Sequence, residues 1–150
     1  MKEQKTCSFF VSTNHLLTIV LPYINEKINE GKNVNIISQK DLTEDVKKYL
    51  RNVKGFDNEK ILKICWKNKK YCKNADENTV LFLIGEKQFV ESMDYADNIY
   101  EVVKCYEIKN IEIIKNVTEK FDYYLRTDGK VKILKNSHKG QNSNTVISQL

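Results

Sequence analysis

Glycine and proline are scarce in this chain, which has five glycines and one proline among 150 residues. No Gly-x-Gly occurs, so the dinucleotide-binding fingerprint is missing. The stretch "VSTNHLL" (residues 11–17) follows an apolar run, where a nucleotide-binding domain would hold its phosphate loop. It has neither the glycines nor the Lys-Ser/Thr pair that cradle phosphates and magnesium. These absences argue against ATP or GTP hydrolysis by the P-loop route.

Histidine and cysteine are also few. His15 is the only histidine of the expected folded region, because His138 falls in the expected tail. Hydrolytic triads need a base close to a nucleophile, and zinc sites need several ligands at workable spacing. Four irregularly spaced cysteines form no Cys-x-x-Cys pair: Cys7, Cys65, Cys72 and Cys105. We therefore expect reduced thiols, no catalytic residues, no metal and no cofactor.

Long hydrophobic runs are absent as well. No apolar run reaches the roughly 18 residues that span a bilayer, and "MKEQKTCSFF" does not have the pattern of a secretory signal. We expect a cytoplasmic protein with no membrane partner. The 41% hydrophobic and 30% charged residues fit one soluble globular domain, and the formal charge of +5 favours acidic partners only weakly.

Short apolar runs alternate with amphipathic segments along the chain. The apolar runs predict strands at residues 6–12, 33–38, 60–66, 79–85, 104–108 and 130–134. Helical spacing predicts helices at 15–30, capped by Thr13 or Asn14, and at 41–53, 86–103 and 111–127. The run "TVLFLIG" (79–85) is the most apolar, which is typical of a central strand.

This order predicts an α/β fold, a three-layer sandwich with a mostly parallel, five- to six-stranded sheet of Rossmann-like or RecA-like type. We expect a single α/β domain over residues 1–135. Residues 136–150 are polar at first and have no periodicity, so we expect a flexible C-terminal tail with a small apolar end.

The run "LLTIVLPYINEKINEGKNVNIISQKDLTEDVKKYL", followed by "KILKICW", resembles the opening of the MEDS sensory domains of methanogen and methylotroph regulators. Those domains are similar to RecA and KaiC folds that lack a working phosphate loop. The resemblance covers about residues 6–66, and the chain departs from it in having no histidine just before the first strand. It implies a sensory or regulatory domain and identifies no ligand.

In a sheet of this type, ligands bind beyond the carboxyl ends of the strands. Polar groups at a helix N-terminus there favour an anion, such as a small phosphate or carboxylate. The candidate ligand-binding residues are Ser12, Thr13, Asn14, His15, Ser38, Gln39 and Glu86. In the alternative interpretation, Thr13 and Asn14 merely cap the helix, His15 is a surface or first-turn residue, and Glu86 is an exposed residue favouring the next helix.

The stretch "KICWKNKKYCK" is a second candidate site. Lysines interleaved with aromatic rings can hold a nucleic-acid backbone while the rings stack on bases. The residues concerned are Lys63, Trp66, Lys67, Lys69, Lys70, Tyr71 and Lys73. The alternative interpretation is a solvated loop with Trp66 tucked against the sheet, and nucleic acid is not the favoured partner.

We therefore expect a non-catalytic, cytoplasmic sensory or regulatory domain that binds a small ligand or a regulatory protein partner at the carboxyl edge of its sheet. A nucleic-acid or nucleotide-binding protein using residues 63–73 is the alternative. An enzyme using His15 and a carboxylate is a third, weaker hypothesis. An exposed edge strand or an apolar helix face leaves a homodimer open.

Overall fold

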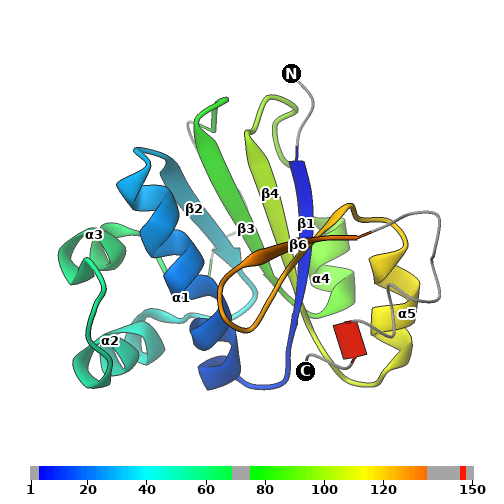
Figure 1. The fold of residues 1–150 in the computed structure, drawn as a ribbon, viewed down its shortest axis with the longest axis horizontal. Helices are drawn as coiled ribbons and strands as arrows, with labels where there is room; N and C mark the ends of the chain where they lie inside the picture. Colours follow the sequence, from blue (N-terminus) through cyan, green and yellow to red (C-terminus); the bar gives the residue numbers. More distant parts are fainter. Residues whose placement is uncertain (1–3, 69–74, 135–145, 148–150) are drawn as a thin grey trace.

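The computed structural model describes residues 4–68, 75–134 and 146–147, and Figure 1 shows the arrangement of their helices and strands. In chain order the elements are β1 (Gln4–Phe10), α1 (Thr13–Asn29), β2 (Asn33–Ser38), α2 (Thr43–Asn52), α3 (Asn58–Lys63), β3 (Thr79–Gly85), α4 (Lys87–Ser92), β4 (Glu101–Glu107), α5 (Glu112–Thr118), β5 (Tyr123–Leu125) and β6 (Val131–Ile133).

The strands form one six-stranded sheet in the order β2-β3-β4-β1-β5-β6. The α/β character is thus confirmed, but the sheet is mixed, and the prediction of a mostly parallel sheet is wrong. β5 and β6 pair antiparallel, whereas β2 with β3, β3 with β4, β4 with β1, and β1 with β5 are parallel. The reason is the short turn after β5, where Gly129 has a φ of 77°. So short a connection permits a hairpin and not a parallel crossover.

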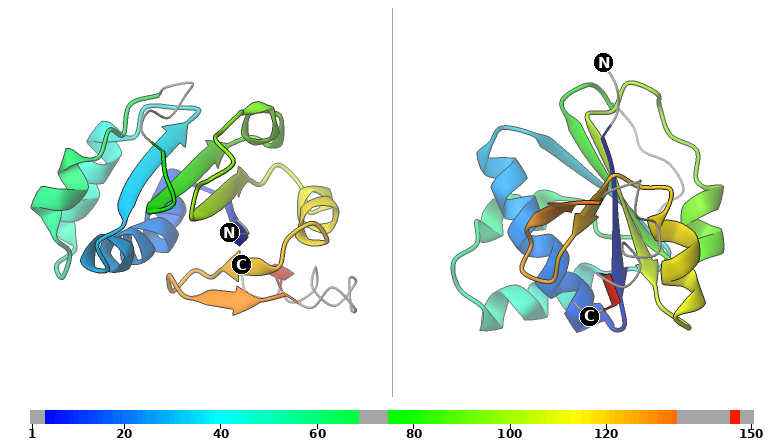
Figure 2. Two further views of the ribbon diagram at one scale, coloured as in Figure 1. Left: turned by 90° about the horizontal axis from the view of Figure 1, so that it is seen from above. Right: turned by 45° about the vertical axis from the view of Figure 1, so that its right-hand side comes forward.

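Side chains alternate between the two faces of the sheet, and each face has its own hydrophobic core. On one face Phe82 and Val103 pack with buried residues of α1, α2 and α3. On the other face Leu83 and Tyr106 pack with buried residues of α4 and α5. Figure 2 shows α1 and α4 on opposite sides of the sheet. Burial on both faces explains why β3 is apolar at every position from Thr79 to Ile84 except the first.

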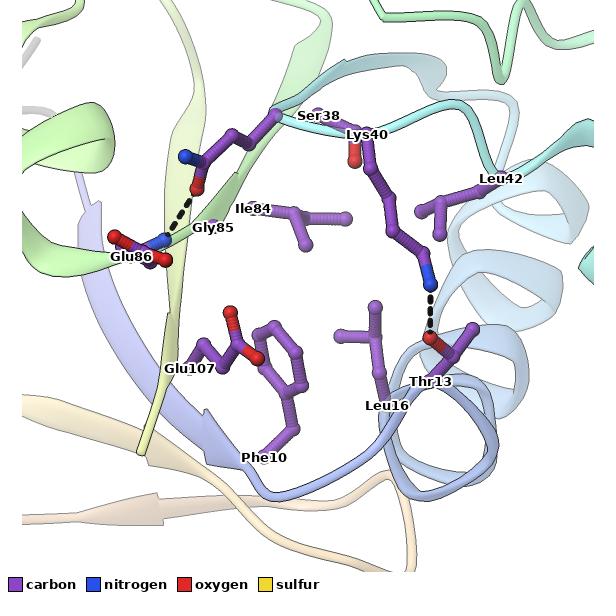
Figure 3. A pocket seen from close by; sticks show the side chains of 11 residues that line it. Phe10, Thr13, Leu16, Ser38, Lys40, Leu42, Ile84, Gly85, Glu86 and Glu107 are labelled. Atoms are coloured by element: carbon purple, nitrogen blue, oxygen red, sulfur yellow. Dashed lines mark hydrogen bonds between the residues drawn. The ribbon is translucent and has the colours of Figure 1, made fainter. Parts of the chain in front are cut away.

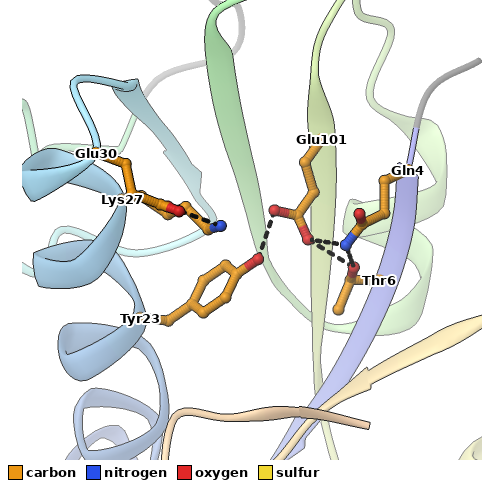
Figure 4. A network of polar contacts seen from close by, with 6 residues as sticks. All are labelled: Gln4, Thr6, Tyr23, Lys27, Glu30 and Glu101. Atoms are coloured by element: carbon orange, nitrogen blue, oxygen red, sulfur yellow. Dashed lines mark hydrogen bonds and ion pairs between the residues drawn. The ribbon is translucent and has the colours of Figure 1, made fainter. Parts of the chain in front are cut away.

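A buried carboxylate joins three elements near the amino ends of the strands. Glu101 of β4 is 0% exposed and accepts hydrogen bonds from Gln4 Nε2 at 2.9 Å, Thr6 Oγ1 at 2.7 Å and the Tyr23 hydroxyl at 2.6 Å. Figure 4 shows these groups converging from β1 and α1. Burial, and then the charge of Glu101, raise the pKa of Tyr23, so its hydroxyl stays protonated and donates. A buried carboxylate without cationic partners among these contacts needs such donors.

One predicted strand, at residues 60–66, is wrong. These residues form most of α3 and the segment after it, and β2 and β3 are direct neighbours in the sheet. Asp57 caps α3 by accepting a hydrogen bond from the backbone N–H of Lys60 at 3.2 Å. Ile61 then points into the core. A short apolar run fits a strand and a buried helical turn equally well, and here the cap decides.

Two predicted helices are too long. The helix at 86–103 is confined to α4, because Val102 and Val103 belong to β4. The helix at 111–127 is confined to α5, and its last part is β5. These β-branched and aromatic residues also fit a pleated strand, and pairing with β1 favours that state.

The domain boundary at residue 135 leaves out a buried residue. Val146 is fully buried in the core that contains α4 and α5, and Ile147 packs against it. The rest of the expected tail at 136–150 lies outside the described residues.

The Glu101 network gives a first prediction. Replacing Tyr23 by Phe removes the donor to Glu101 Oε1 and leaves that oxygen unsatisfied in the core. We expect the free energy of unfolding, measured by urea titration, to fall by about 1.5–3 kcal/mol. Tyr49→Phe is the control, because no hydrogen bond of the Tyr49 hydroxyl is found among the described residues. Equal stability of the two variants would show that the network contributes nothing.

Candidate functional site

The carboxyl ends of β1, β2, β3 and β4 lie at one edge of the sheet, and a pocket of about 270 Å³ opens there. Figure 3 shows the side chains around it. Its walls come from segments far apart in the sequence: Phe10, Thr13, Leu16, Ser38, Gln39, Lys40, Leu42, Ile84, Gly85, Glu86 and Glu107. The volume lies just below the range of about 300–1,000 Å³ typical of sites for drug-sized ligands.

The floor of the pocket is apolar. Phe10 ends β1, Leu16 comes from the first turn of α1, and Ile84 lies near the end of β3. Together with Leu42, these side chains belong to the core of the α1 face. A ligand on this floor would therefore rest on a wall held by the hydrophobic core, which favours a pre-formed site.

On one side of the pocket, Lys40 and Thr13 are joined. Lys40 Nζ donates a hydrogen bond to Thr13 Oγ1 at 2.7 Å, which links the segment after β2 to the first residue of α1. Figure 3 shows this pair beside Leu16 and Leu42. The ammonium group is thus oriented at the rim, near the positive end of a 17-residue helix.

Two carboxylates lie across the pocket from Lys40, as Figure 3 shows. Glu86 follows β3 and Glu107 ends β4. Lys109 Nζ lies 3.7 Å from Glu86 Oε1 and 3.6 Å from Glu107 Oε1, with 58% of its side chain exposed. Exposed ion pairs of this kind contribute little free energy, so both carboxylates stay available to a second cationic group.

Gly85 allows the side chain of Gln39 to cross the end of β3. Gln39 Oε1 accepts a hydrogen bond from the backbone N–H of Glu86 at 2.8 Å. A Cβ at Gly85, whose φ is 156°, would lie 2.7 Å from Gln39 Oε1 and 2.9 Å from Phe89 Cδ1. Only glycine fits under this bridge between β2 and β3.

Ser38, the last residue of β2, is the most informative polar group of the pocket. Its side chain is 2% exposed, and its hydroxyl has no hydrogen-bond partner among the described residues. Figure 3 shows its oxygen directed toward the open space of the pocket. Among the described residues, the fully enclosed side-chain oxygen without a partner is Thr43 Oγ1, so the Ser38 oxygen is not sealed in the core. It borders the pocket, where it can bond to a ligand or to water.

Four of the predicted ligand-binding residues meet in this pocket: Thr13, Ser38, Gln39 and Glu86. The other three do not line it. Ser12 is the N-cap of α1, where its hydroxyl accepts from the backbone N–H of His15 at 3.1 Å, so the predicted caps Thr13 and Asn14 already belong to the helix. Asn14 lines a second, polar hollow of about 480 Å³ between α1 and α2.

His15 closes the turn between β1 and α1. Its Nδ1 accepts a hydrogen bond from the backbone N–H of Val11 at 3.0 Å, which favours the neutral imidazole. Partial burial lowers the pKa of His15 below 6.5. The side chain thus has a local structural role, in agreement with the alternative interpretation of this residue.

The basic stretch is only partly described. Trp66 is 2% exposed, and its Nε1 donates to the Ile61 carbonyl at 2.9 Å, so its ring is not free to stack on a base. Lys63 Nζ lies 3.5 Å from Glu59 Oε1 on α3, and Lys67 is exposed. The remaining predicted residues lie outside the described part of the chain: Lys69, Lys70, Tyr71 and Lys73.

Lys40, Glu107 and the apolar floor were not among the predicted site residues. Lys40 lies next to Gln39 in the segment after β2, and Glu107 ends β4. A consistent search for charged residues at strand ends would have found both. The floor residues carry no such signal, because apolar residues of a pocket and of a core have the same pattern.

Thiols and acidic residues do not form a metal site in the described ranges, where no group of three or more His, Cys, Asp or Glu is placed to hold an ion. Cys7 and Cys105 are buried, and burial raises the pKa of both thiols, so they stay protonated. None of the helices described here is long and apolar enough to cross a membrane.

Comparisons with known protein families, with curated proteins and with solved structures find no match to this chain.

The Gln39 bridge gives a second prediction. Gly85→Ala forces Gln39 and Phe89 apart, so we expect a lower free energy of unfolding and shifted amide NMR signals at Gln39 and Glu86. The control is Gly31→Ala, where φ is 83° but no atom lies within 4 Å of the added Cβ. In that variant the free energy of unfolding should fall only by the cost of the left-handed backbone, about 1–2 kcal/mol. A Gly85 variant no less stable than the Gly31 variant would contradict the bridge.

The turn at His15 gives a third prediction. Because burial favours the neutral ring, its pKa in the folded state, followed by NMR of the ring signals, should lie below the model-peptide value of 6.5. The folded state then binds fewer protons than the unfolded state, so this contribution to stability is complete above pH 6.5 and is lost as the pH falls through the folded-state pKa. His15→Gln should remove this part of the pH dependence. A pKa at or above 6.5 would contradict this account.

Proposed function

We propose that this chain is a non-catalytic sensory or regulatory domain that binds a small ligand in the pocket at the carboxyl edge of its sheet. The observation that carries the proposal is the pocket itself, where the hydroxyl of Ser38 has no hydrogen-bond partner among the described residues and can therefore bond to a ligand. Around it are an oriented ammonium, two carboxylates and an apolar floor, the mixture typical of small-molecule sites.

The arrangement of groups supports binding over catalysis. Among the residues that line the pocket there is no histidine and no cysteine. The one close contact between a hydroxyl and a basic group is that of Thr13 with Lys40, in which the lysine donates. An ammonium that donates cannot at the same time accept the proton of a nucleophile.

We also propose a three-layer, Rossmann-like or RecA-like placement of the elements, in which the pocket occupies the position of a lost phosphate loop. Supporting this, helices contribute to a separate core on each face of the sheet, and β1 leads directly into α1 at the pocket. The pocket then lies where ligands bind in such sheets. A cytoplasmic location and a regulatory protein partner that supplies the output belong to the same proposal.

The nucleic-acid alternative has less support. It relies on aromatic rings that stack on bases, and the indole of Trp66 is buried with its N–H paired, while Tyr71 lies outside the described residues.

Ser38 provides a test of the proposal. The protein is screened by thermal shift against a library of small metabolites, and each hit is measured by calorimetry on the wild type and on Ser38→Ala. We expect the variant to be about as stable as the wild type, because the substitution breaks no hydrogen bond of the Ser38 hydroxyl within the described residues. We expect it to bind the hit up to about tenfold more weakly.

Ser92→Ala is the matched control, since the Ser92 hydroxyl is exposed on α4, where it donates to the Phe89 carbonyl. Hits that bind the Ser38 and Ser92 variants equally well would place the ligand elsewhere. Turnover of a ligand by the purified protein would contradict a non-catalytic role.

A further inference from the structure

Opposite charges are separated across the pocket. Figure 3 shows the Lys40 ammonium beside Thr13 on one side and the carboxylate of Glu107 on the other, with Glu86 beyond it. No ion pair joins Lys40 to either carboxylate among the described residues. The pocket therefore presents a positive side and a negative side to whatever fills it.

The positive side suits a carboxylate. Lys40 donates one N–H to Thr13 Oγ1 at 2.7 Å, which fixes the direction of the ammonium and leaves its other hydrogens for a second acceptor. Thr13 is also the first residue of α1, so the dipole of that helix adds to the attraction. A charge-assisted hydrogen bond from a pre-oriented ammonium is among the stronger contacts available to a small anion.

The negative side suits an ammonium group. Two carboxylates, those of Glu86 and Glu107, face one cation, Lys109, at 3.7 Å and 3.6 Å. One negative charge is left over on this side. Because Lys109 is largely exposed, a ligand ammonium can join or replace it at little cost.

The space between the two sides limits the ligand's body. Its floor is the apolar set Phe10, Leu16, Leu42 and Ile84, and its volume is about 270 Å³. Ser38 adds one hydroxyl at the edge of this space, beside Lys40. Together these features fit a compact molecule with an apolar part and charged groups of both signs. A polyphosphate or a dicarboxylate would instead meet Glu86 and Glu107 with charges of the same sign.

We propose that the ligand is a zwitterion of amino-acid size, with its carboxylate toward Lys40 and Thr13, its ammonium toward Glu86 and Glu107, and its side chain on the apolar floor. This inference depends on the proposed ligand-binding function and specifies the ligand class for the same pocket.

The test is a calorimetric panel on the purified protein. It contains the proteinogenic amino acids and, as matched probes for leucine, 4-methylpentanoate, which lacks the ammonium, and 3-methylbutylamine, which lacks the carboxylate. We expect at least one amino acid to bind, and its analogues without either charge to bind at least about tenfold more weakly. Amide NMR signals of Ser38 and Gly85 should shift on binding, which places the ligand in this pocket.

Charge variants separate the two sides. Lys40→Gln and Glu107→Gln should each weaken binding of the amino acid by about tenfold or more, because each removes one charged partner. Lys40→Gln should leave binding of the amine-only probe unchanged, and Glu107→Gln should leave binding of the acid-only probe unchanged. The matched controls are Lys47→Gln and Glu59→Gln, on the surfaces of α2 and α3. They should bind like the wild type.

Three outcomes would overturn the inference. If an acid-only or amine-only probe binds as tightly as its parent amino acid, the ligand is not recognised as a zwitterion, and the proposed ligand-binding function still stands. The same holds if no amino acid binds while a nucleotide, sugar or dicarboxylate shifts the Ser38 and Gly85 signals. If no member of the panel or of the metabolite library binds in the pocket, the inference and the proposed function both fail.

Discussion

The pairing of β1 on both of its edges is the constraint on which the rest of this structure depends. All seven residues of β1 pair in register with β4, and Thr6 and Cys7 pair with β5 on the other side. The strand is thereby fixed in the interior of the sheet. Since Phe10 ends β1 and Ser12 already caps α1, fixing β1 also fixes the amino end of α1. The position of Thr13, and with it one wall of the pocket, follows from that pairing.

Polar side chains at the two ends of the sheet have different surroundings. At the amino ends, Glu101 is enclosed by donors from Gln4, Thr6 and Tyr23, and such a satisfied network rigidifies its surroundings. At the carboxyl ends, the hydroxyl of Ser38 borders the pocket and has no hydrogen-bond partner among the described residues. Polar groups that border a pocket are left for solvent or a ligand to satisfy, whereas those in the core must be paired within the protein.

Local signals predicted part of this architecture. The strands Asn33–Ser38 and Thr79–Gly85 are confirmed to the residue, because their apolar runs are bounded by turn residues. The strand predicted at residues 60–66 is wrong because Asp57, which lies outside the apolar run, caps a helix there. The rule that ligands bind at the carboxyl ends of strands selected Thr13, Ser38, Gln39 and Glu86, which line one pocket. It could not show that Ser12 and His15 form local contacts in the turn instead. The strand order and the burial of Trp66, whose carbonyl accepts from the Leu42 N–H, depend on contacts between distant segments.

The contacts of the pocket join residues far apart in the sequence, and this affects when the pocket forms during folding. The Lys40–Thr13 contact spans 27 residues, and the Gln39–Glu86 contact spans 47. Contacts between such distant residues form late, because loop-closure entropy opposes them until much of the sheet has assembled. Glu107 is the last wall residue to leave the ribosome, and β4 must insert between β3 and β1 to bring it into place. A nascent chain therefore has no complete pocket until β4 has been synthesised and has joined the sheet.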